Sequence, residues 1–323
     1  MALLRSAARG DLKAVLRLAK ALDSYNLPFD PKIIRKLIET SIRSFQGKMP
    51  RAKAKYLFVI EDPESKKIFG ASLIVAKQGT TASPHIYFEK RKGLLHFGAT
   101  SDGPTEIGGL ILQRLYRRRK ERYGKQLSWV RFLYMACHPE RFGQKILAEF
   151  LPPLPKGKSL FWEAVGRRVT GLAYREADHL SVYTKQFIFD LFPKKIEISR
   201  LPGRVHTVLG KVAPQAEGAG RMLKRIGFRQ MGRIEPFDGG PYYEAERTKI
   251  TVIRKAVKAA FEKNESALTE GIRALLLLER KGKVRGCVGV CRFQKGKLFL
   301  DSQAAKLLAP KRREAILLVP FGR

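Results

Sequence analysis

The sequence predicts an α+β or mixed α/β fold, with a twisted, mainly antiparallel sheet flanked by helices and a small β-rich domain at the C-terminal end. Three observations predict this class. Two helical patterns come first, a series of β-type runs follows, and a glycine-containing strand then leads through a basic turn into another helix. We expect two domains, which comprise residues 1–247 and 248–323.

The first two elements are amphipathic helices. Apolar residues recur at helical spacing from Leu12 to Ala19 and again from Ile34 to Phe45. Asp30 is suited to cap the second helix, and Pro31 fits its first position because proline lacks the N–H that would be unpaired there.

Two pairs of β-type runs follow the helices. Tyr56 to Ile60 and Ile68 to Ala76 are separated by a turn-forming sequence and predict a hairpin. Ile86 to Phe88 and Leu94 to Phe97 predict a second, shorter pair.

A strand–turn–helix segment then suggests a site for phosphate groups. The run from Ile107 to Leu115 contains Gly108 and Gly109, and glycine inside a strand indicates a bulge or a close approach of the backbone. A basic turn from Arg117 to Lys125 precedes a helical pattern that begins near Leu127. Such a turn directs backbone N–H groups and a positive helix end at one point, which suits a pyrophosphate. A merely solvated basic turn is the alternative.

The second half continues the alternation of helices and strands. We expect a strand over Lys145 to Phe150, a helix over Ser159 to Val169, and a helix over Ala219 to Phe228 that runs into a strand. Beyond Glu246 we expect a helix and then strands at these positions: Ile250 to Phe261 for the helix, and Ala274 to Leu278, Val284 to Phe293, Leu298 to Leu300 and Ile316 to Val319 for the strands.

The composition is strongly basic, with 64 Lys and Arg against 29 Asp and Glu and a formal net charge of +35. Such a charge attracts nucleic acids, anionic membrane surfaces and phosphorylated cofactors. The basic residues are spread along the whole chain, without a basic tail or an RNA-binding signature. Nucleic-acid binding is therefore the less favoured hypothesis.

Metal and membrane functions are not expected. The five histidines, His85, His96, His138, His179 and His206, lack metal-ligand spacing, and the three cysteines indicate a reducing compartment. The chain shows neither a signal peptide nor an apolar run of roughly 20 residues. We expect a cytoplasmic protein without a membrane span.

Short motifs along the chain resemble one family in order and spacing. They lie at 56–62, 105–107, 127–128, 131–133, 148–150, 159–162, 166–168, 177–178, 187–188, 208–212, 227–228 and 237–241. These pieces resemble the arginine N-succinyltransferases, which have the GNAT type of N-acyltransferase fold, here in a single or tandem arrangement. The resemblance covers about Leu12 to Glu246.

The resemblance implies an enzyme that transfers a succinyl group from succinyl-CoA to the α-amine of arginine, in arginine catabolism. It implies that the bulged strand and the basic turn contact the acyl-CoA. The residues concerned are Gly109, Leu110, Arg117, Arg118, Lys120 and Gly124.

The catalytic residue remains unknown from the sequence. The family has a Gly-x-Val-His-Pro pattern, whose histidine is its presumed proton donor. The corresponding residues here are Gly210 to Pro214, with Ala213 at the histidine position, and His206 is a weak candidate to replace that histidine. Five acids lie near family motifs and are candidates for binding the substrate: Glu106, Glu149, Glu163, Asp178 and Asp238.

Two alternatives stay open. The chain could acylate another amine, since the loop from Leu151 to Lys158 lacks the carboxylates that a guanidinium prefers. It could also be a basic nucleic-acid-binding protein on an inactive acyltransferase scaffold. The sequence does not predict an oligomeric state.

Overall fold

The computed structural model describes residues 1–22, 27–181, 183–263, 268 and 270–322 and groups the chain into two compact units. Unit 1 comprises Met1–Ala76, Ile107–Gly143 and Thr248–Arg323, and unit 2 comprises Lys77–Glu106 and Gln144–Arg247. The expected boundary after residue 247 coincides with one of these breaks. The segment 248–323, however, groups with the N-terminal part of the chain, and its independence as a domain stays a prediction.

Unit 1 is built on strands that run in the order β12-β15-β11-β14-β13-β1-β2-β3-β6. Their bounds are β1 Leu3–Ser6, β2 Lys55–Glu61, β3 Ile68–Val75, β6 Thr105–Leu112, β11 Val257–Phe261, β12 Ile272–Arg280, β13 Lys283–Gln294, β14 Lys297–Leu300 and β15 Ala315–Pro320. The expected hairpin of β2 and β3 is confirmed, with Phe58 opposite Ser72. Strand β1 joins the two parts of the sheet, because Leu4 pairs with Ile60 on one side and with Gly286 on the other.

The C-terminal strands close on themselves. Strand β12 pairs with β15 at one side and with β13 at the other, while β11 lies between β15 and β14. Helix α11, Ser302–Leu308, packs on this ring, and its apolar residues join a core that includes Leu276, Leu298 and Leu318. The sequence did not predict this helix.

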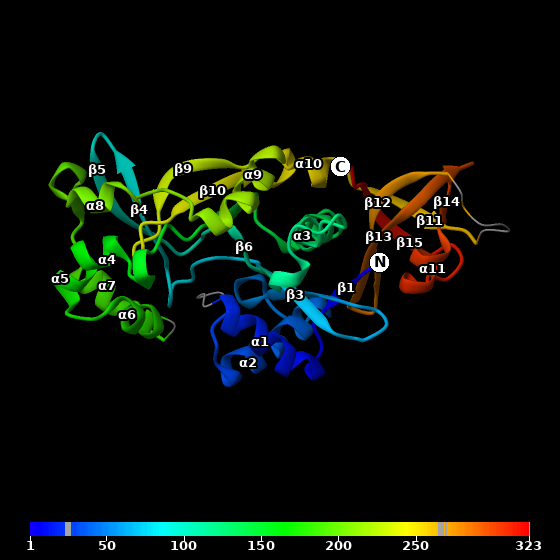
Figure 1. The fold of residues 1–323 in the computed structure, drawn as a ribbon, viewed down its shortest axis with the longest axis horizontal. Coiled ribbons are helices and arrows are strands. Elements are labelled where there is room, and N and C mark those ends of the chain that lie inside the picture. The colour runs from blue at the N-terminus through cyan, green and yellow to red at the C-terminus, as the bar shows by residue number, and fades with distance from the viewer. Residues whose placement is uncertain (23–26, 182, 264–267, 269, 323) are drawn as a thin grey trace. The chain divides into compact units, whose positions relative to one another are not determined.

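The other helices of unit 1 are α1 Leu12–Leu22, α2 Pro31–Phe45, α3 Tyr123–Cys137 and α10 Thr251–Arg254. Helices α1 and α2 pack against β3 and β2 respectively (Figure 1). Asp30 caps α2 as expected: its side chain accepts the N–H groups of Lys32 and Ile33 at 2.7 and 3.0 Å, with Pro31 in the first turn.

Unit 2 contains strands in the order β7-β10-β9-β4-β5-β8. Their bounds are β4 His85–Arg91, β5 Leu94–Thr100, β7 Lys145–Glu149, β8 Lys195–Glu197, β9 Arg229–Ile234 and β10 Pro241–Glu246. The predicted pair of β4 and β5 is confirmed. The first residues of β6 also belong here, since Thr105 and Glu106 pair in parallel with Ile146 and Leu147 of β7.

Short helices surround this sheet: α4 Leu160–Ala164, α5 Gly166–Thr170, α6 Tyr174–Ser181, α7 Gln186–Leu191, α8 Gly203–His206 and α9 Glu217–Arg225. Their core centres on Trp162, whose ring stacks on Phe237 at 5.1 Å between centroids and whose Nε1 donates to Leu172 O at 2.9 Å. Ser159 caps α4 through Trp162 N and also donates to Phe237 O, which fixes the loop before β10 against the helices.

Three predicted elements differ from the structure. The helix expected over Ile250 to Phe261 is wrong: only Thr251–Arg254 is helical, and Val257–Phe261 forms β11 because it pairs with β15 and β14. The helix expected over Ser159 to Val169 is broken at Val165 into α4 and α5. Helix α3 already begins at Tyr123, so Gly124 and Lys125 belong to the helix and not to the turn.

Among the described residues, none of the helices is both long enough and apolar enough to cross a bilayer.

Replacing Asp30 by alanine should lower the free energy of unfolding by about 1 kcal/mol, because two N–H groups of α2 lose their acceptor. Asp30→Asn should change it little, since asparagine caps helices about as well as aspartate does. Urea unfolding followed by circular dichroism compares the two variants. No loss in Asp30→Ala would show that the cap contributes nothing.

Candidate active site

A left-handed glycine interrupts strand β6 in unit 1. Gly109 has φ +55°, and a Cβ built there would lie 3.2 Å from Cβ of Leu73 on the neighbouring strand. Both the backbone conformation and the close approach favour glycine at this position. The predicted irregularity in the strand is therefore present, with Leu110 directly after it.

A buried arginine supports this irregular segment. The Nη1 group of Arg131, on α3, donates to Gly108 O at 3.3 Å, while Nη2 donates to Ser128 Oγ at 3.1 Å. Burial lowers the pKa of Arg131 to about 9, so the guanidinium remains charged at neutral pH. The side chain thus fixes one carbonyl of the bulged strand to the helix that follows it.

The turn between β6 and α3 is exposed and basic. Arg117, Arg118 and Lys120 are all exposed, and Arg118 and Arg122 have left-handed backbone angles of φ +58° and +57°. For a residue with a long side chain this conformation is strained, and such strain is common where a loop has a binding role.

The N-terminus of α3 is suited to an anion. The residue before it, Arg122, makes no capping hydrogen bond with its side chain, and the first turn has no acidic residue. Gly124 lies in this turn, and a Cβ there would meet no protein atom within 4 Å. Packing within the protein therefore does not require glycine, whereas the close approach of a phosphate would.

Unit 2 holds a cluster of four carboxyl groups and one lysine, which we call the acidic cluster. Its members are Glu106 on β6, Glu149 on β7, Lys185 just before α7, and Glu235 and Asp238 in the loop between β9 and β10. Glu106 and Asp238 are buried, and the others are partly buried.

The loop backbone positions two of these carboxylates. Glu235 Oε2 accepts the N–H groups of Phe237 and Asp238 at 2.6 and 2.9 Å, and Asp238 Oδ1 accepts that of Gly240 at 2.7 Å. On β6, Glu106 is held by the side-chain amide of Gln78, which donates to its Oε2.

Removal from water governs the ionisation of the cluster. Burial raises the pKa of Glu149 and of Glu235 well above the usual value, and neighbouring carboxylates add to both shifts. Burial likewise raises the pKa of Asp238 to about 7. Burial also lowers the pKa of Lys185, against the opposing pull of Glu149, Glu235 and Glu106. One ammonium thus faces several carboxyl groups that are poorly solvated.

Two rings border the cluster. Burial, followed by the charges of Lys185 and Arg233, lowers the pKa of His85 to about 3, so its imidazole is neutral at physiological pH. The ring stacks on Tyr242 at 5.6 Å between centroids. The Tyr242 hydroxyl donates to Ile86 O at 3.3 Å and also hydrogen-bonds Glu149, and burial raises the pKa of this phenol well above its usual value.

The structure brings together three of the five acids that the sequence suggested for substrate binding, Glu106, Glu149 and Asp238. A fourth, Asp178 on α6, is close enough for its charge to raise the pKa of Asp238. Glu163 instead forms an ion pair with Arg167, one helical turn away at 3.0 Å.

Neither His206 nor the residue at the family histidine position, Ala213, provides a base at this cluster. His206 is exposed, and its Nε2 lies 3.0 Å from the carbonyl of Leu201. Ala213 is buried, its N–H donates to Leu151 O at 2.9 Å, and its methyl group cannot transfer a proton.

Sequence reasoning missed four residues: Glu235, Lys185, His85 and Tyr242. Glu235 could have been suspected, because it directly precedes the turn that contains Asp238. The other three come from segments whose local pattern indicates only structure.

Comparison with known proteins decides the family. The family model described as arginine N-succinyltransferase beta subunit matches residues 2–252, more than two thirds of the chain. The chain belongs to the arginine N-succinyltransferase family.

Individual members of the arginine N-succinyltransferase family support this assignment. An arginine N-succinyltransferase of Enterobacter sp. is 29% identical over 303 residues, covering 88% of both chains. That of Shigella dysenteriae is 30% identical over 274 residues, covering 79% of both. The solved structure of arginine/ornithine succinyltransferase subunit AI from Pseudomonas aeruginosa matches with a TM-score of 0.85 and 28% identity, covering 100% of this chain and 99% of that one.

Membership of the arginine N-succinyltransferase family confirms two expectations. The fold is that of the GNAT-type N-acyltransferases, with mixed helices and strands. The protein is an N-acyltransferase, and an acyl-CoA is its co-substrate.

The contribution of Asp238 to the stability of the protein should fall as the pH rises from 5 towards 8. Asp238 has a pKa of about 7 in the folded chain against an ordinary 3.8, so the folded state binds its proton more tightly. This stabilisation is complete below about pH 4 and is lost as the pH rises to 7, at about 1.4 kcal/mol per unit of pKa difference. Glu149 and Glu235 act in the same direction.

Thermal unfolding at pH 5 and pH 8 measures this difference. Asp238→Asn should reduce it, because an amide does not titrate. The matched control is Asp190→Asn on the exposed face of α7, which should leave it unchanged. A difference of the same size in the wild type and in Asp238→Asn would contradict the role of Asp238.

Proposed function

We propose that this protein transfers the succinyl group of succinyl-CoA to the α-amine of arginine. The observation that carries the proposal is the acidic cluster of unit 2, which is partly withdrawn from water in a chain whose net charge is +35. Burial of carboxyl groups costs free energy unless a positive charge lies beside them. A cationic substrate would provide that charge when it binds.

A guanidinium group meets the needs of the cluster. It stays charged at any pH that proteins tolerate, and its planar fork forms paired hydrogen bonds with carboxylates. Glu235 and Asp238 are assigned to this role because their loop holds both carboxylates through backbone N–H groups. Binding of the cation would lower the raised pKa of each and so offset the cost of their burial.

Glu149 is assigned as the base that takes a proton from the α-ammonium of the substrate. A carboxylate with a raised pKa is a better proton acceptor near neutral pH than an ordinary one. A proton acceptor at Glu149 would perform the role that the methyl group of Ala213 cannot.

The acyl-CoA is assigned to unit 1. The uncapped N-terminus of α3 and the exposed Arg117, Arg118 and Lys120 suit its pyrophosphate, and the bulged segment at Gly109 and Leu110 suits its pantetheine arm. The extra negative charge of a succinyl donor fits these basic surroundings.

The reaction is direct acyl transfer. The neutral α-amine attacks the thioester carbonyl carbon, a C–N bond forms, and the negative charge on the carbonyl oxygen is stabilised by a backbone N–H of the bulged strand. The attacking nitrogen loses a proton as the intermediate collapses, the C–S bond breaks, and the CoA thiolate that leaves takes up one proton. The amide product and free CoA balance the two substrates.

The names of the relatives agree with this substrate pair. The proteins of Enterobacter sp. and Shigella dysenteriae are named for arginine and a succinyl group, and the Pseudomonas aeruginosa subunit for arginine or ornithine. Ornithine carries an ammonium in place of the guanidinium, so it is the natural competitor to test.

Release of free thiol from succinyl-CoA should depend on a cationic amino acid. We expect turnover with arginine, slower turnover with ornithine, and little with citrulline, which has the shape of arginine without its charge. Acetyl-CoA should be a poorer donor. Equal turnover with citrulline and arginine would show that the acidic cluster does not recognise the charge of the substrate. No turnover with arginine, ornithine or citrulline would refute the proposed acceptor.

Glu149→Gln and Glu235→Gln should change different kinetic constants. Loss of the base should lower kcat by about a hundredfold or more, whereas loss of a guanidinium partner should raise the KM for arginine by about tenfold. The KM for succinyl-CoA should stay unchanged in both, as measured by thiol release.

Glu163→Gln is the matched control, because this glutamate of α4 pairs with Arg167 of α5 and lies outside the acidic cluster. Its constants should equal those of the wild type. An unchanged kcat in Glu149→Gln would exclude Glu149 as the base, and an unchanged KM for arginine in Glu235→Gln would exclude Glu235 from the guanidinium site.

A further inference from the structure

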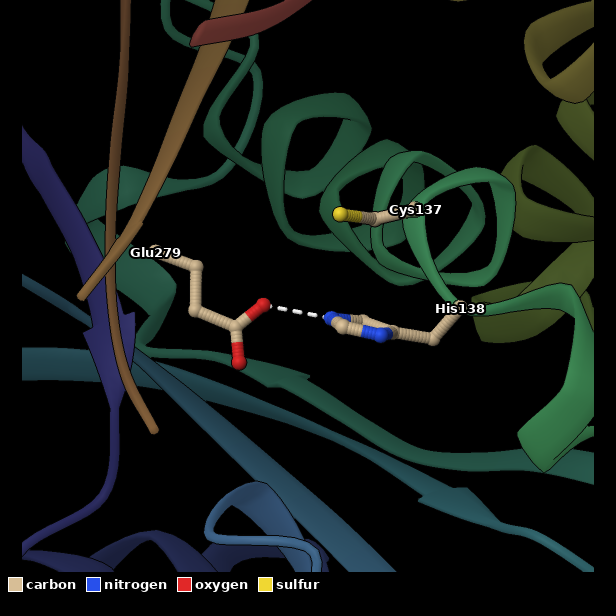
Figure 2. Close-up of side chains that lie close together, drawn as sticks. All are labelled: Cys137, His138 and Glu279. Carbon is tan, nitrogen blue, oxygen red and sulfur yellow. Dashed lines mark hydrogen bonds and ion pairs between the residues drawn. The ribbon is translucent and has the colours of Figure 1, made fainter. Parts of the chain in front are cut away.

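Three side chains with metal-binding atoms meet in unit 1, outside every part used above. Cys137 is the last residue of α3, His138 follows it, and Glu279 lies on β12. One ligand atom from each lies within 4.8 Å of the other two. Figure 2 shows the carboxylate of Glu279 facing the His138 ring, with Cys137 at the end of the helix above them.

Each ring nitrogen of His138 faces a carboxylate. Its Nε2 lies 2.5 Å from Glu279 Oε2, while its Nδ1 lies 3.5 Å from Glu140 Oε1. A carboxylate at the second ring nitrogen fixes the ring and makes the first nitrogen a better ligand. The ring also packs against Tyr134 at 4.8 Å between centroids.

We propose that Cys137, His138 and Glu279 bind a zinc ion. A thiolate, an imidazole and a carboxylate are the three kinds of side chain that bind Zn²⁺, and three protein ligands leave a fourth position for water. Ligand bonds of about 2.0–2.3 Å place tetrahedral ligand atoms roughly 3.3–3.8 Å apart. The ion enters when Glu279 withdraws from the histidine by about 1 Å and the thiol turns inward, both of which are rotations of side chains.

The charges of the site are consistent with a divalent ion. Arg141, Lys48 and Lys281 line a surface pocket of about 440 Å³ that includes Glu279, so an excess of positive charge would be repelled there. One thiolate and one carboxylate cancel the two charges of Zn²⁺ and leave a neutral complex. The thiol proton, and any proton on the imidazole, are released to water when the ion binds.

The ion would tie two distant segments of unit 1 together. His138 and Glu279 are 141 residues apart, and α3 packs against β12. A zinc bridge at this point therefore anchors the C-terminal end of α3 to the strands that close on themselves.

Cobalt provides a direct test on the full chain after treatment with a chelator. Co²⁺ bound to a thiolate has a charge-transfer absorption in the near ultraviolet that oxygen and nitrogen ligands alone do not give. We expect this absorption to saturate at one cobalt per chain and to disappear when zinc is added. Cys137→Ser should abolish it, and Cys291→Ala should retain it, since that buried cysteine belongs to the core of the C-terminal strands.

Zinc affinity, measured by competition with a chromophoric chelator, gives the second readout. Cys137→Ser and Glu279→Gln should each weaken zinc binding by at least about tenfold, since even outer partners of metal ligands contribute that much. Circular dichroism checks that both variants fold. The proposal is overturned if the wild type shows no thiolate absorption, or if both variants bind zinc as tightly as the wild type does.

Discussion

The cost of withdrawing carboxyl groups from water is the constraint on which the candidate active site depends. Glu106, Glu149 and Glu235 share one lysine. Backbone N–H groups give Glu235 and Asp238 part of what water would otherwise provide. The stacked pair of Trp162 and Phe237 fixes the loop that bears two of these acids. Unit 1 shows the opposite arrangement, with a buried guanidinium behind the bulged strand and an uncapped helix end among exposed arginines. The charge that each unit leaves unbalanced suits one of the two substrates of an N-acyltransferase.

Local signals predicted much of the fold. The capped start of α2, the two hairpins and the passage from β6 to α3 follow from hydrogen bonds and apolar spacing within a few residues. The prediction failed where the conformation of a segment depends on residues far away in the sequence. Val257 to Phe261 has a helical spacing of apolar residues, yet its backbone pairs with β15 and β14, and these non-local hydrogen bonds override the local preference. The break at Val165 and the earlier start of α3 depend in the same way on packing.

The candidate site was predicted in part. Glu106, Glu149 and Asp238 were named from the motifs beside them, and the structure places them in one cluster. Lys185 and Tyr242 were not named, because a single lysine before a helix or a tyrosine in a strand has no periodic signal of its role. The position of Ala213 showed that the family histidine was absent, but only folding reveals a carboxylate with a raised pKa elsewhere. The meeting of His138 with Glu279 likewise depends on tertiary structure, since no spacing rule joins residues so far apart.

Strand β1 lies between β2 and β13, so it gains its second partner only after a much later segment of the chain has been synthesised. Unit 2 is made from residues 77–106 and 144–247, all of which leave the ribosome before β13 does. During synthesis the acidic cluster can therefore form while the edge of β1 is still unpaired. An exposed strand edge in a half-made chain invites pairing with other chains, and the basic charge spread along this sequence opposes such encounters between copies.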